Sequence, residues 1–512
     1  MLNSTAQKEI LISVGAAEFR AAIVENGGLQ DLVWDVLIGA DERSSPRRLG
    51  RCRSRLGEVI LGRVQKVMSG MQAAFIDVGM ERAGFLGIRE ARCLAEEQAH
   101  GDEDLPAIGT CVREGAEIVV QIIKDPMGDK GARLTASISI PGRLLVLTPH
   151  RSRVAVSRRI VDEPERDRLT ALCNLILADF QNAPLSRAGF IVRSAAAGAD
   201  LAELRADAER LAEVWQGILA AWKGTRAPVT LHRDLAPIER TLRDELDAQT
   251  SRIVIDDLET VEAARAYCRR TMPDAEARLD FFSGPGTLFD RYGIEDCITQ
   301  LGQPRVPLPS GGWITIESTE ALTAIDVNSG SFIDAGGLEE TSLRVNREAA
   351  REIGRHLRLR GIGGVTIVDF IHMTAPGSKQ QVLDALAAAL SRDRAPTQIS
   401  PISEFGLVAI TRKRVRDPLT KRVTERCPAC HGDGRIRSCE SVGFDILRQV
   451  ERAAVAAPGS AIAVRAAPDV VRWIAVHEDE VRAGLARRGA SRVSFEAREE
   501  FRREGFDVAT EP

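Results

Sequence analysis

The chain contains two apolar, β-branched runs that each carry one carboxylate near the C-terminal end, ALTAIDVNSG at 321–330 and GGVTIVDFIHM at 363–373. Between them, apolar residues recur at helical spacing in ETSLRVNREAAREIGRHLRLRG. A strand, a helix and a second strand in this order form a βαβ unit, whose strands run parallel and end at the same edge of the sheet. We therefore predict that Asp326 and Asp369, 43 residues apart, converge at that edge.

The two aspartates need an explanation, because a carboxylate on a buried strand normally finds a partner, a proton or a metal ion. Asn328 follows Asp326 on the same face, so the three side chains offer the oxygen ligands that Mg²⁺ or Mn²⁺ prefers. Such an ion activates water and neutralises the charge of a scissile phosphate. Alternatively, Asp326 caps a turn and Asp369 pairs with an arginine of 355–360. The two aspartates together favour the metal.

The length of 512 residues exceeds what one hydrophobic core can organise and predicts about three or four domains. A hydrophobic content of 44% is typical of a globular chain, and a net charge of −4 does not decide whether the chain binds nucleic acid. The N-terminal residues lack the basic and apolar regions of a signal peptide, and no apolar run has the length of a membrane span. We therefore expect a cytoplasmic protein without an intrinsic membrane segment.

The pattern of apolar residues changes several times along the chain. Residues 9–35 alternate between apolar and polar and turn at ENGG, which is typical of a β-meander. Between 57 and 140, five short strand patterns with glycines at the bends predict a small barrel. Residues 141–240 mix strands with an amphipathic helix, residues 241–301 are mainly helical, and residues 440–512 suggest a small α+β region.

Cys427 and Cys430 belong to CPACHGDG, a Cys-x-x-Cys loop closed by glycines that is typical of one zinc knuckle. Structural zinc needs four ligands. Either Cys439 and His431 complete the shell within one chain, although outside knuckle spacing, or two protomers each contribute one pair. A redox dithiol is the remaining alternative, and the lack of a recognisable thioredoxin-like βαβ unit around the pair argues against it.

Taken together, these features resemble the RNase E/G family of bacterial endoribonucleases over nearly the full length of the chain. The resemblance is carried, in order, by ILISVGAAEFRAAIVENG, AAFIDVGMERAGFLGI, GFIVRSAAAG, RVPLPSGGWITIESTEALTAIDVNSG, LRLRGIGGVTIVDFIHM, FGLVAITRKRVR and CPACHGDG. It implies a multidomain α/β and α+β fold. Its parts would be an RNase H-like domain in two segments (1–40 and 239–301), an inserted S1-like RNA-binding OB barrel (55–140), a 5′-sensor subdomain (141–238), a DNase I-like catalytic subdomain (302–426), a zinc-link (427–435) and a small α+β C-terminal domain (436–512).

The resemblance also implies how RNA is held. Phe75 and Phe85 match the family's aromatic residues that pack on a base, and Lys130 matches a basic contact; stacking supplies about 1–3 kcal/mol per base without sequence choice. The alternative is that either phenylalanine belongs to the barrel core. Arg193 and Ser194 match the Arg-Thr pair with which the family holds a 5′-terminal monophosphate. Serine keeps the hydroxyl, so we expect 5′-end sensing to be retained.

For the reaction, the resemblance makes Asp326 and Asp369 the two magnesium-binding aspartates and Asn328 the asparagine that helps to orient them. His372 stands where relatives often carry a further acid. The implied activity is hydrolysis of single-stranded RNA, favouring 5′-monophosphorylated substrates, to leave 5′-phosphate and 3′-hydroxyl ends. The implied processes are rRNA processing and mRNA decay.

Cys427 and Cys430 match the family's zinc-link, in which two protomers share one zinc ion, so a homodimer or homotetramer is implied. The chain does not carry the long Arg- and Pro-rich tail of some relatives, which favours the shorter, RNase G-like branch over a degradosome scaffold. A basic run at 412–426 is either a path for the RNA backbone or a solvated surface segment.

Two other functions remain open at the level of sequence. A non-catalytic RNA-binding or ribosome-associated factor would keep the barrel and the shared zinc, but it would not need Asp326, Asn328 and Asp369. A DNA nuclease would need them, but the resemblance is to enzymes that act on RNA.

Overall fold

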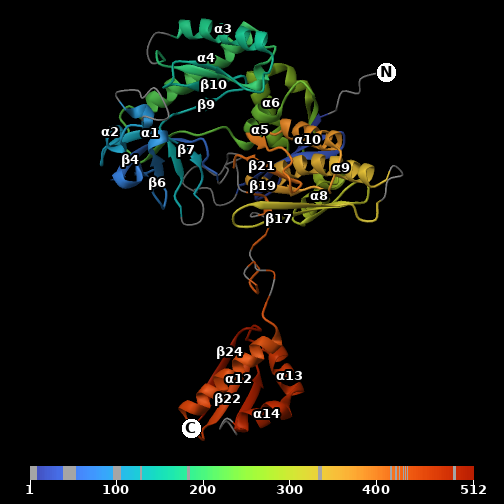
Figure 1. Cartoon of the computed structure of the whole chain (residues 1–512). Helices are drawn as coiled ribbons and strands as arrows, with labels where there is room; N and C mark the ends of the chain where they lie inside the picture. Colours follow the sequence, from blue (N-terminus) through green and yellow to red (C-terminus); the bar gives the residue numbers. More distant parts are fainter. Residues whose placement is uncertain are drawn as a thin grey trace. The chain divides into compact units, whose positions relative to one another are not determined.

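The computed structural model describes residues 8–37, 54–95, 105–126, 130–180, 185–332, 337–414, 418–420, 424–425, 427–430, 432, 434, 436–487 and 492–511. They belong to two compact units, Met1–Arg416 and Asp417–Pro512. Four sheets of the described residues lie in the first unit and one in the second (Figure 1). Within these ranges, no helix has both the length and the apolarity needed to cross a bilayer.

The N-terminal meander is present as predicted. β1 (Lys8–Val14), β2 (Glu18–Glu25) and β3 (Gly28–Val36) pair antiparallel in sequence order. Asn26 and Gly27 join β2 to β3 with φ angles of 51° and 76°. Two successive positive φ angles suit the two-residue hairpin turn that Asn-Gly favours.

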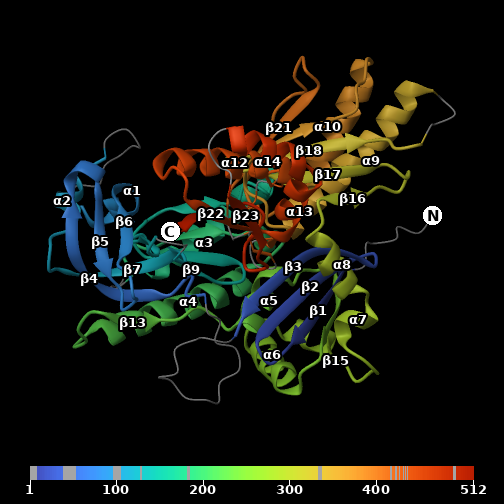
Figure 2. The ribbon, with the colours of Figure 1, turned by 90° about the horizontal axis from the view of Figure 1, so that it is seen from below.

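The meander is completed by strands from far along the chain. β14 (Thr250–Ile255) pairs parallel to β1, and β15 (Leu279–Phe281) pairs parallel to β14, so that blue and green segments lie side by side in Figure 2. The helices of this region are α5 (Pro237–Glu245), α6 (Leu258–Thr271), α7 (Leu288–Arg291) and α8 (Ile294–Leu301), with the 3₁₀ turn η4 (Pro273–Arg278). The residues between β3 and α5 are therefore an insertion between the two segments that build this sheet and its core.

The predicted five-stranded barrel forms within this insertion. Its strands are β4 (Val59–Met68), β5 (Ala73–Asp77), β6 (Gly84–Gly87), β8 (Arg133–Thr135) and β7 (Glu117–Lys124), in this spatial order, and β7 pairs back with β4. This closure is OB-like. The barrel also contains η1 (Ser69–Met71), α1 (Ile88–Ala91), η2 (Arg92–Leu94) and α2 (Ile108–Cys111), and β13 (Val229–His232) pairs with β4 from outside.

A four-stranded sheet with two long helices makes up the rest of the insertion. Its elements are β9 (Ile140–Pro141), β10 (Leu145–Thr148), β11 (Val154–Val156), α3 (Glu163–Asp179), β12 (Gly189–Val192), η3 (Ser194–Ala196) and α4 (Leu201–Trp222). α4 is the predicted amphipathic helix, and Asp200 caps it by accepting the N–H of Glu203. Asp207, 3% exposed, accepts the N–H groups of Leu144 and Leu145 and so ties α4 to β10.

The sheet that carries Asp326 and Asp369 has six strands. In spatial order they are β16 (Arg305–Pro307), β17 (Trp313–Ser318), β18 (Thr323–Asn328), β19 (Gly364–Asp369), β21 (Leu407–Arg412) and β20 (Thr397–Ile399). β18, α9 (Leu338–Leu359) and β19 form the predicted βαβ unit with parallel strands. α9 and α10 (Pro376–Ser391) pack on one face of this sheet through a shared apolar core (Figure 1).

The other face of this sheet is open, which corrects the expectation of buried strands. In β18, Ile325 and Val327 are buried, whereas Asp326 is exposed and Asn328 half-buried. In β19, Val368 is buried and Asp369 is exposed. The apolar residues therefore face α9 and α10, and the carboxylates face solvent. Neither aspartate is a buried charge that needs a partner to offset the cost of its burial.

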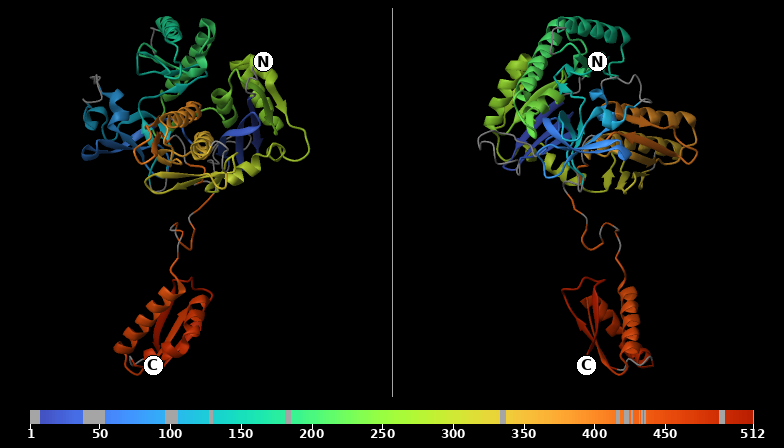
Figure 3. Two further views of the ribbon diagram at one scale, coloured as in Figure 1. Left: turned by 45° about the vertical axis from the view of Figure 1, so that its right-hand side comes forward. Right: turned by 90° about the vertical axis from the view of Figure 1, so that its left-hand side faces the viewer.

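The second unit is a three-stranded sheet with helices. Its elements are α12 (Cys439–Ala456), β22 (Ala461–Ala466), α13 (Pro468–Val476), α14 (Glu478–Arg487), β23 (Val493–Ala497) and β24 (Phe506–Glu511). β22 lies in the centre, parallel to β23 and antiparallel to β24. α12 runs along the sheet (Figure 3). The connection from β22 through α13 and α14 to β23 is a βαβ unit, which was not recognised in the sequence.

Candidate active site

Asp326 and Asp369 are direct neighbours in the register of the parallel pair β18–β19. Parallel strands lie about 4.8 Å apart, and register partners project from the same face of the sheet. Both carboxylates are therefore on the open face and within reach of one ion. The predicted convergence of the two aspartates is confirmed.

Asn328 lies two residues beyond Asp326 on the same face, and its Nδ2 donates a hydrogen bond of 2.6 Å to Oδ2 of Asp326. This bond fixes the orientation of one carboxylate and leaves its second oxygen open. His372 is exposed beyond the end of β19. Asn328 thus orients the carboxylate of Asp326, whereas His372 forms no hydrogen bond to either carboxylate among the described residues.

The alternative roles of the aspartates are wrong. Asp326 lies within β18 rather than at a turn. The arginines of 355–360 bond elsewhere: Arg355 pairs with Glu352, Arg358 donates to the carbonyl oxygen of Ala389, and Arg360 donates to His356 and to the carbonyl oxygen of Gln303. Neither aspartate has a cationic side-chain partner within the described ranges.

The donor set on this face fits magnesium. Mg²⁺ is commonly held by one or two carboxylates and keeps several waters that bridge to substrate phosphates. Asp326 and Asp369 supply two exposed carboxylates, and no group of three or more His, Cys, Asp or Glu ligands occurs among the residues that the structure describes. A fully protein-made metal cage is thus not formed there, and two carboxylates on an open face match the magnesium pattern.

Phe75 and Phe85 are register partners on β5 and β6, with ring centroids 6.0 Å apart and an interplanar angle of 75°. Both are half-buried on the outer surface, whereas Ala74, Ile76 and Leu86 fill the barrel. Neither phenylalanine belongs to the barrel core, so that alternative is wrong. Lys130, the predicted basic contact, is exposed.

Register adds two basic residues that sequence reasoning missed. Lys66 pairs with Phe75, and Arg133 pairs with Phe85, and both basic side chains are exposed. The order Lys66, Phe75, Phe85, Arg133 therefore crosses four barrel strands. Only the pairing of strands far apart in the sequence reveals this row, because no local motif contains it.

Arg193 and Ser194 lie at the end of β12, where η3 begins. Ser194 is exposed. Arg193 donates to the carbonyl oxygen of Gly142 at 2.5 Å and to Oδ1 of Asp244 at 2.7 Å. Burial disfavours the Asp244 carboxylate, but hydrogen bonds and charges from Arg243 and Arg193 outweigh it and lower the pKa of Asp244 to about 2. Asp244 therefore holds Arg193 in place as a charged partner.

Cys427 is exposed and Cys430 half-buried, and both are free thiols. The backbone N–H groups of Cys430 and Ala429 point at the sulfur of Cys427 and lower its pKa, which favours the thiolate that binds metals. Cys439, one of the two residues considered for completing the shell within one chain, instead donates to Asp469 at 3.6 Å. His431 lies outside the described residues.

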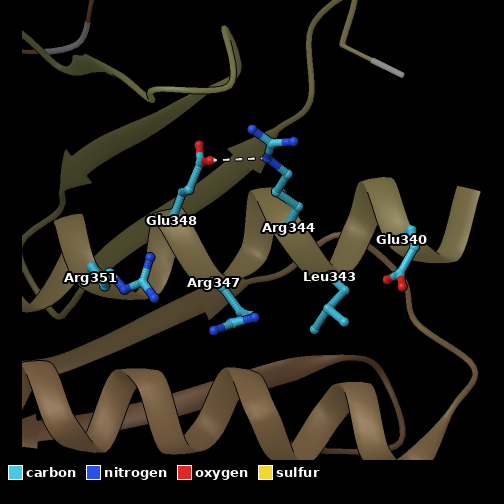
Figure 4. A pocket seen from close by; sticks show the side chains of 6 residues that line it. All are labelled: Glu340, Leu343, Arg344, Arg347, Glu348 and Arg351. Atoms are coloured by element: carbon cyan, nitrogen blue, oxygen red, sulfur yellow. Dashed lines mark ion pairs between the residues drawn. The ribbon is translucent and has the colours of Figure 1, made fainter. Parts of the chain in front are cut away.

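A second polar surface lies on the exposed side of α9. It contains a groove of about 420 Å³, and Figure 4 shows the side chains that line it: Glu340, Leu343, Arg344, Arg347, Glu348 and Arg351. Arg344 pairs with Glu348 at 3.6 Å. Arg347 and Arg351 are exposed and form no hydrogen bond or ion pair with the described residues. Because α9 packs on the covered face of the sheet, this groove lies across the sheet from the aspartates.

The basic run at 412–426 is not one uniform surface. Arg412 is buried and pairs with Asp393 at 2.6 Å, so it is a structural residue. Arg414 is exposed. Arg416, Lys421, Arg422 and Arg426 lie outside the described residues.

Comparison with known proteins assigns the chain to a family. Residues 139–415 match the model of the Ribonuclease E/G family, and residues 426–511 match the model named RNase E/G, Thioredoxin-like domain. The chain belongs to the Ribonuclease E/G family. It is 35% identical to Ribonuclease G of Escherichia coli (strain K12) over 504 residues, which cover 98% of this chain and 99% of that protein.

Other relatives agree with this assignment. Ribonuclease G of Haemophilus influenzae is 36% identical over 509 residues, covering 98% of this chain and 99% of that protein. Ribonuclease E of E. coli is 36% identical over 460 residues, covering 89% of this chain but 40% of that protein. Within the Ribonuclease E/G family, the chain thus matches the Ribonuclease G pattern from end to end.

The second family match corrects the argument about the cysteine pair. No thioredoxin-like unit is recognisable around the pair in the sequence, but residues 426–511 match a thioredoxin-like domain and contain the parallel pair β22–β23. The fold therefore no longer argues against a redox dithiol.

Proposed function

We propose that this chain is a Mg²⁺-dependent endoribonuclease that hydrolyses single-stranded RNA and leaves 5′-phosphate and 3′-hydroxyl ends. The observation that supports this most directly is the direct register of Asp326 and Asp369 on an open sheet face, with Asn328 bonded to one of them. Family membership supports the choice of RNA as the substrate. Its tasks would be rRNA processing and mRNA decay in the cytoplasm.

In this proposal Asp326 and Asp369 hold the ion, and Asn328 orients Asp326. Bound Mg²⁺ would supply an activated water and neutralise charge on the scissile phosphate. The open face leaves room for an extended strand of RNA, because no helix covers these carboxylates among the described residues.

We assign the parts of the chain as the family resemblance implies. The split sheet would be the RNase H-like domain (1–40 and 239–301), residues 55–140 the S1-like barrel, 141–238 the 5′-sensor, 302–426 the DNase I-like subdomain, 427–435 the zinc-link and 436–512 the C-terminal domain. The pairing of β1 with β14 supports the two-segment assignment of the first of these.

Arg193 and Ser194 would bind a 5′-terminal monophosphate. Asp244 and the carbonyl oxygen of Gly142 use two of the guanidinium nitrogens and fix its plane, and the exposed Ser194 hydroxyl lies beside it. A held guanidinium loses less conformational entropy when it binds phosphate. This supports a preference for monophosphorylated RNA.

Cys427 and Cys430 would bind one zinc ion together with the same pair of a second protomer, giving a homodimer or homotetramer. The lowered pKa of Cys427 supports metal binding, and the engagement of Cys439 by Asp469 supports sharing between protomers. Structural zinc takes four ligands, and this pair supplies two.

The test of the proposed function is cleavage of a short, A/U-rich single-stranded RNA that carries a 5′-monophosphate or a 5′-hydroxyl, with Mg²⁺ or with EDTA. We expect internal cuts only with Mg²⁺, faster cleavage of the monophosphorylated RNA, and products with 5′-phosphate ends. A DNA strand of the same sequence is the control and should stay intact. Tight RNA binding without cleavage would instead favour the non-catalytic RNA-binding factor.

Replacement of both barrel phenylalanines tests the RNA-binding surface. Because base stacking contributes about 1–3 kcal/mol per base, Phe75→Ala/Phe85→Ala should weaken RNA binding by about tenfold or more. Fluorescence anisotropy in EDTA measures this without cleavage. Trp222→Ala is the control, since Trp222 is an aromatic residue that is 43% exposed but lies on α4, outside the barrel. Equal losses in both variants would contradict a role for the barrel surface.

A further inference from the structure

A cationic residue stands in the same row of the open face as the two aspartates. Arg305 on β16 is in register with Thr315 on β17. Thr315 is in register with Asp326 on β18, and Asp326 is in register with Asp369 on β19. Register partners project from the same face, and two strand spacings amount to about 10 Å. The exposed Arg305 is thus on the open face, two strands away from Asp326.

The guanidinium of Arg305 is held by an aromatic ring. Its Cζ lies 3.8 Å from the ring centroid of Trp313, which is a cation–π stack. Trp313 is half-buried and in register with Asn328, and its ring packs so closely on Gly330 that a Cβ there would be 3.0 Å away. The indole is therefore a fixed support for Arg305 beside the candidate active site.

The side-chain hydrogen-bond donors of Arg305 are not used by any residue that the structure describes. Three other arginines of the described chain lie over aromatic rings, and each of them also pairs with a carboxylate: Arg20 with Glu295, Arg270 with Glu239 and Arg344 with Glu348. The side chain of Arg305 forms no hydrogen bond or ion pair with any described residue. Its orientation is thus set by Trp313 alone, and its N–H groups face solvent.

We propose that Arg305, supported by Trp313, binds a backbone phosphate of the RNA strand next to the phosphate held at Asp326 and Asp369. A guanidinium offers a planar set of donors that matches phosphate oxygens. Two carboxylates repel the RNA backbone, and a cation in the same row offsets this repulsion for the neighbouring phosphate. Arg305 is thus a positioning residue, and this role rests on the proposed function for its substrate.

Binding of a labelled single-stranded RNA by the full chain in EDTA, measured over a range of salt concentrations, tests this role independently of cleavage. Loss of one phosphate contact lowers the slope of log K against log salt by about 0.7. We expect Arg305→Gln to show this change and to weaken binding at low salt by about tenfold, and Arg305→Lys to be intermediate. Trp313→Leu should reproduce part of the loss, while Trp313→Phe should not.

Arg347→Gln is the matched control, because Arg347 is also exposed and its side chain is unpaired among the described residues, but it lies on α9, across the sheet. It should bind RNA as the wild type does. In Mg²⁺, Arg305→Gln should raise KM more than it lowers kcat. The proposal is overturned if Arg305→Gln keeps the affinity and the salt slope of the wild type. It is also overturned if Arg347→Gln loses as much RNA affinity as Arg305→Gln, because general charge attraction would then explain both losses. If the wild type binds RNA but does not cleave it, the proposed function is refuted, whereas the effect of Arg305→Gln on RNA binding still tests the role of Arg305.

Discussion

Replacing Asp326 and Asp369 by asparagine is expected to abolish Mg²⁺-dependent RNA cleavage and to leave RNA binding in EDTA intact. Both side chains are exposed and have no cationic partner among the described residues, so the substitutions should change stability by less than about 0.5 kcal/mol. Asparagine keeps the size of the side chain but removes the charge that holds the ion. Loss of a residue that only hydrogen-bonds to a metal ligand lowers metal affinity or activity by about 10–100-fold. Because Asp326 and Asp369 would be ligands themselves, each single variant should lose more than about a hundredfold in cleavage rate.

Initial cleavage rates of the single and double variants at rising Mg²⁺ concentrations measure this effect. The double variant should be no worse than either single one, because groups that hold one ion act as a unit. Asn328→Ala is the graded control: it removes the hydrogen bond to Asp326 but no charge, so higher Mg²⁺ should restore part of its activity. A double variant that cleaves at the wild-type rate would show that the catalytic centre lies elsewhere.

Features that depend on the local pattern of residues could be predicted from the sequence. The meander, the five barrel strands, the helix at 201–222 and the βαβ unit all follow from alternation, helical spacing and turn residues. The convergence of Asp326 and Asp369 was also predictable, because strand–helix–strand order dictates which ends of the strands meet. In each case the decisive information lies within a short segment or in the order of segments.

Features that depend on strand register could not be predicted. In β18 the alternation of Ile325 and Val327 with Asp326 and Asn328 indicates the polar face, but it does not reveal that α9 and α10 are the helices that cover the apolar face. The rows Lys66–Phe75–Phe85–Arg133 and Arg305–Thr315–Asp326–Asp369 each combine residues from four strands. A one-residue shift in any pairing would place their side chains on the opposite face.

Arg412 shows why charge alone does not identify an RNA-binding residue. In the sequence it begins a basic run, but in the structure it is a core residue of the sheet that carries the aspartates. Its Nε and Nη2 donate to the Asp393 carboxylate at 2.6 and 3.1 Å, and its Nη1 donates to the carbonyl oxygen of Ile362 at 2.9 Å. The two side chains are only 5% and 2% exposed. The pair thus joins β21 to the segment that follows α10.

Removing either partner of this pair should destabilise the protein strongly. Arg412→Met or Asp393→Leu alone leaves a buried, uncompensated charge, which costs about 3–5 kcal/mol. The double variant should recover most of this loss, because it buries no charge at all. Denaturant unfolding followed by tryptophan fluorescence measures the shift, since Trp313 lies in the same sheet.

The exposed pair Arg252–Asp280 is the matched control for burial. Its Nε–Oδ2 distance is 2.5 Å, as short as that of the buried pair, but its side chains are 48% and 49% exposed. Water replaces the lost partner there, so Arg252→Met should cost less than about 1 kcal/mol. If both single losses were equal, burial would not be what makes the Arg412–Asp393 pair important. If Arg412→Met were as stable as the wild type but bound RNA more weakly, Arg412 would belong to the RNA path after all.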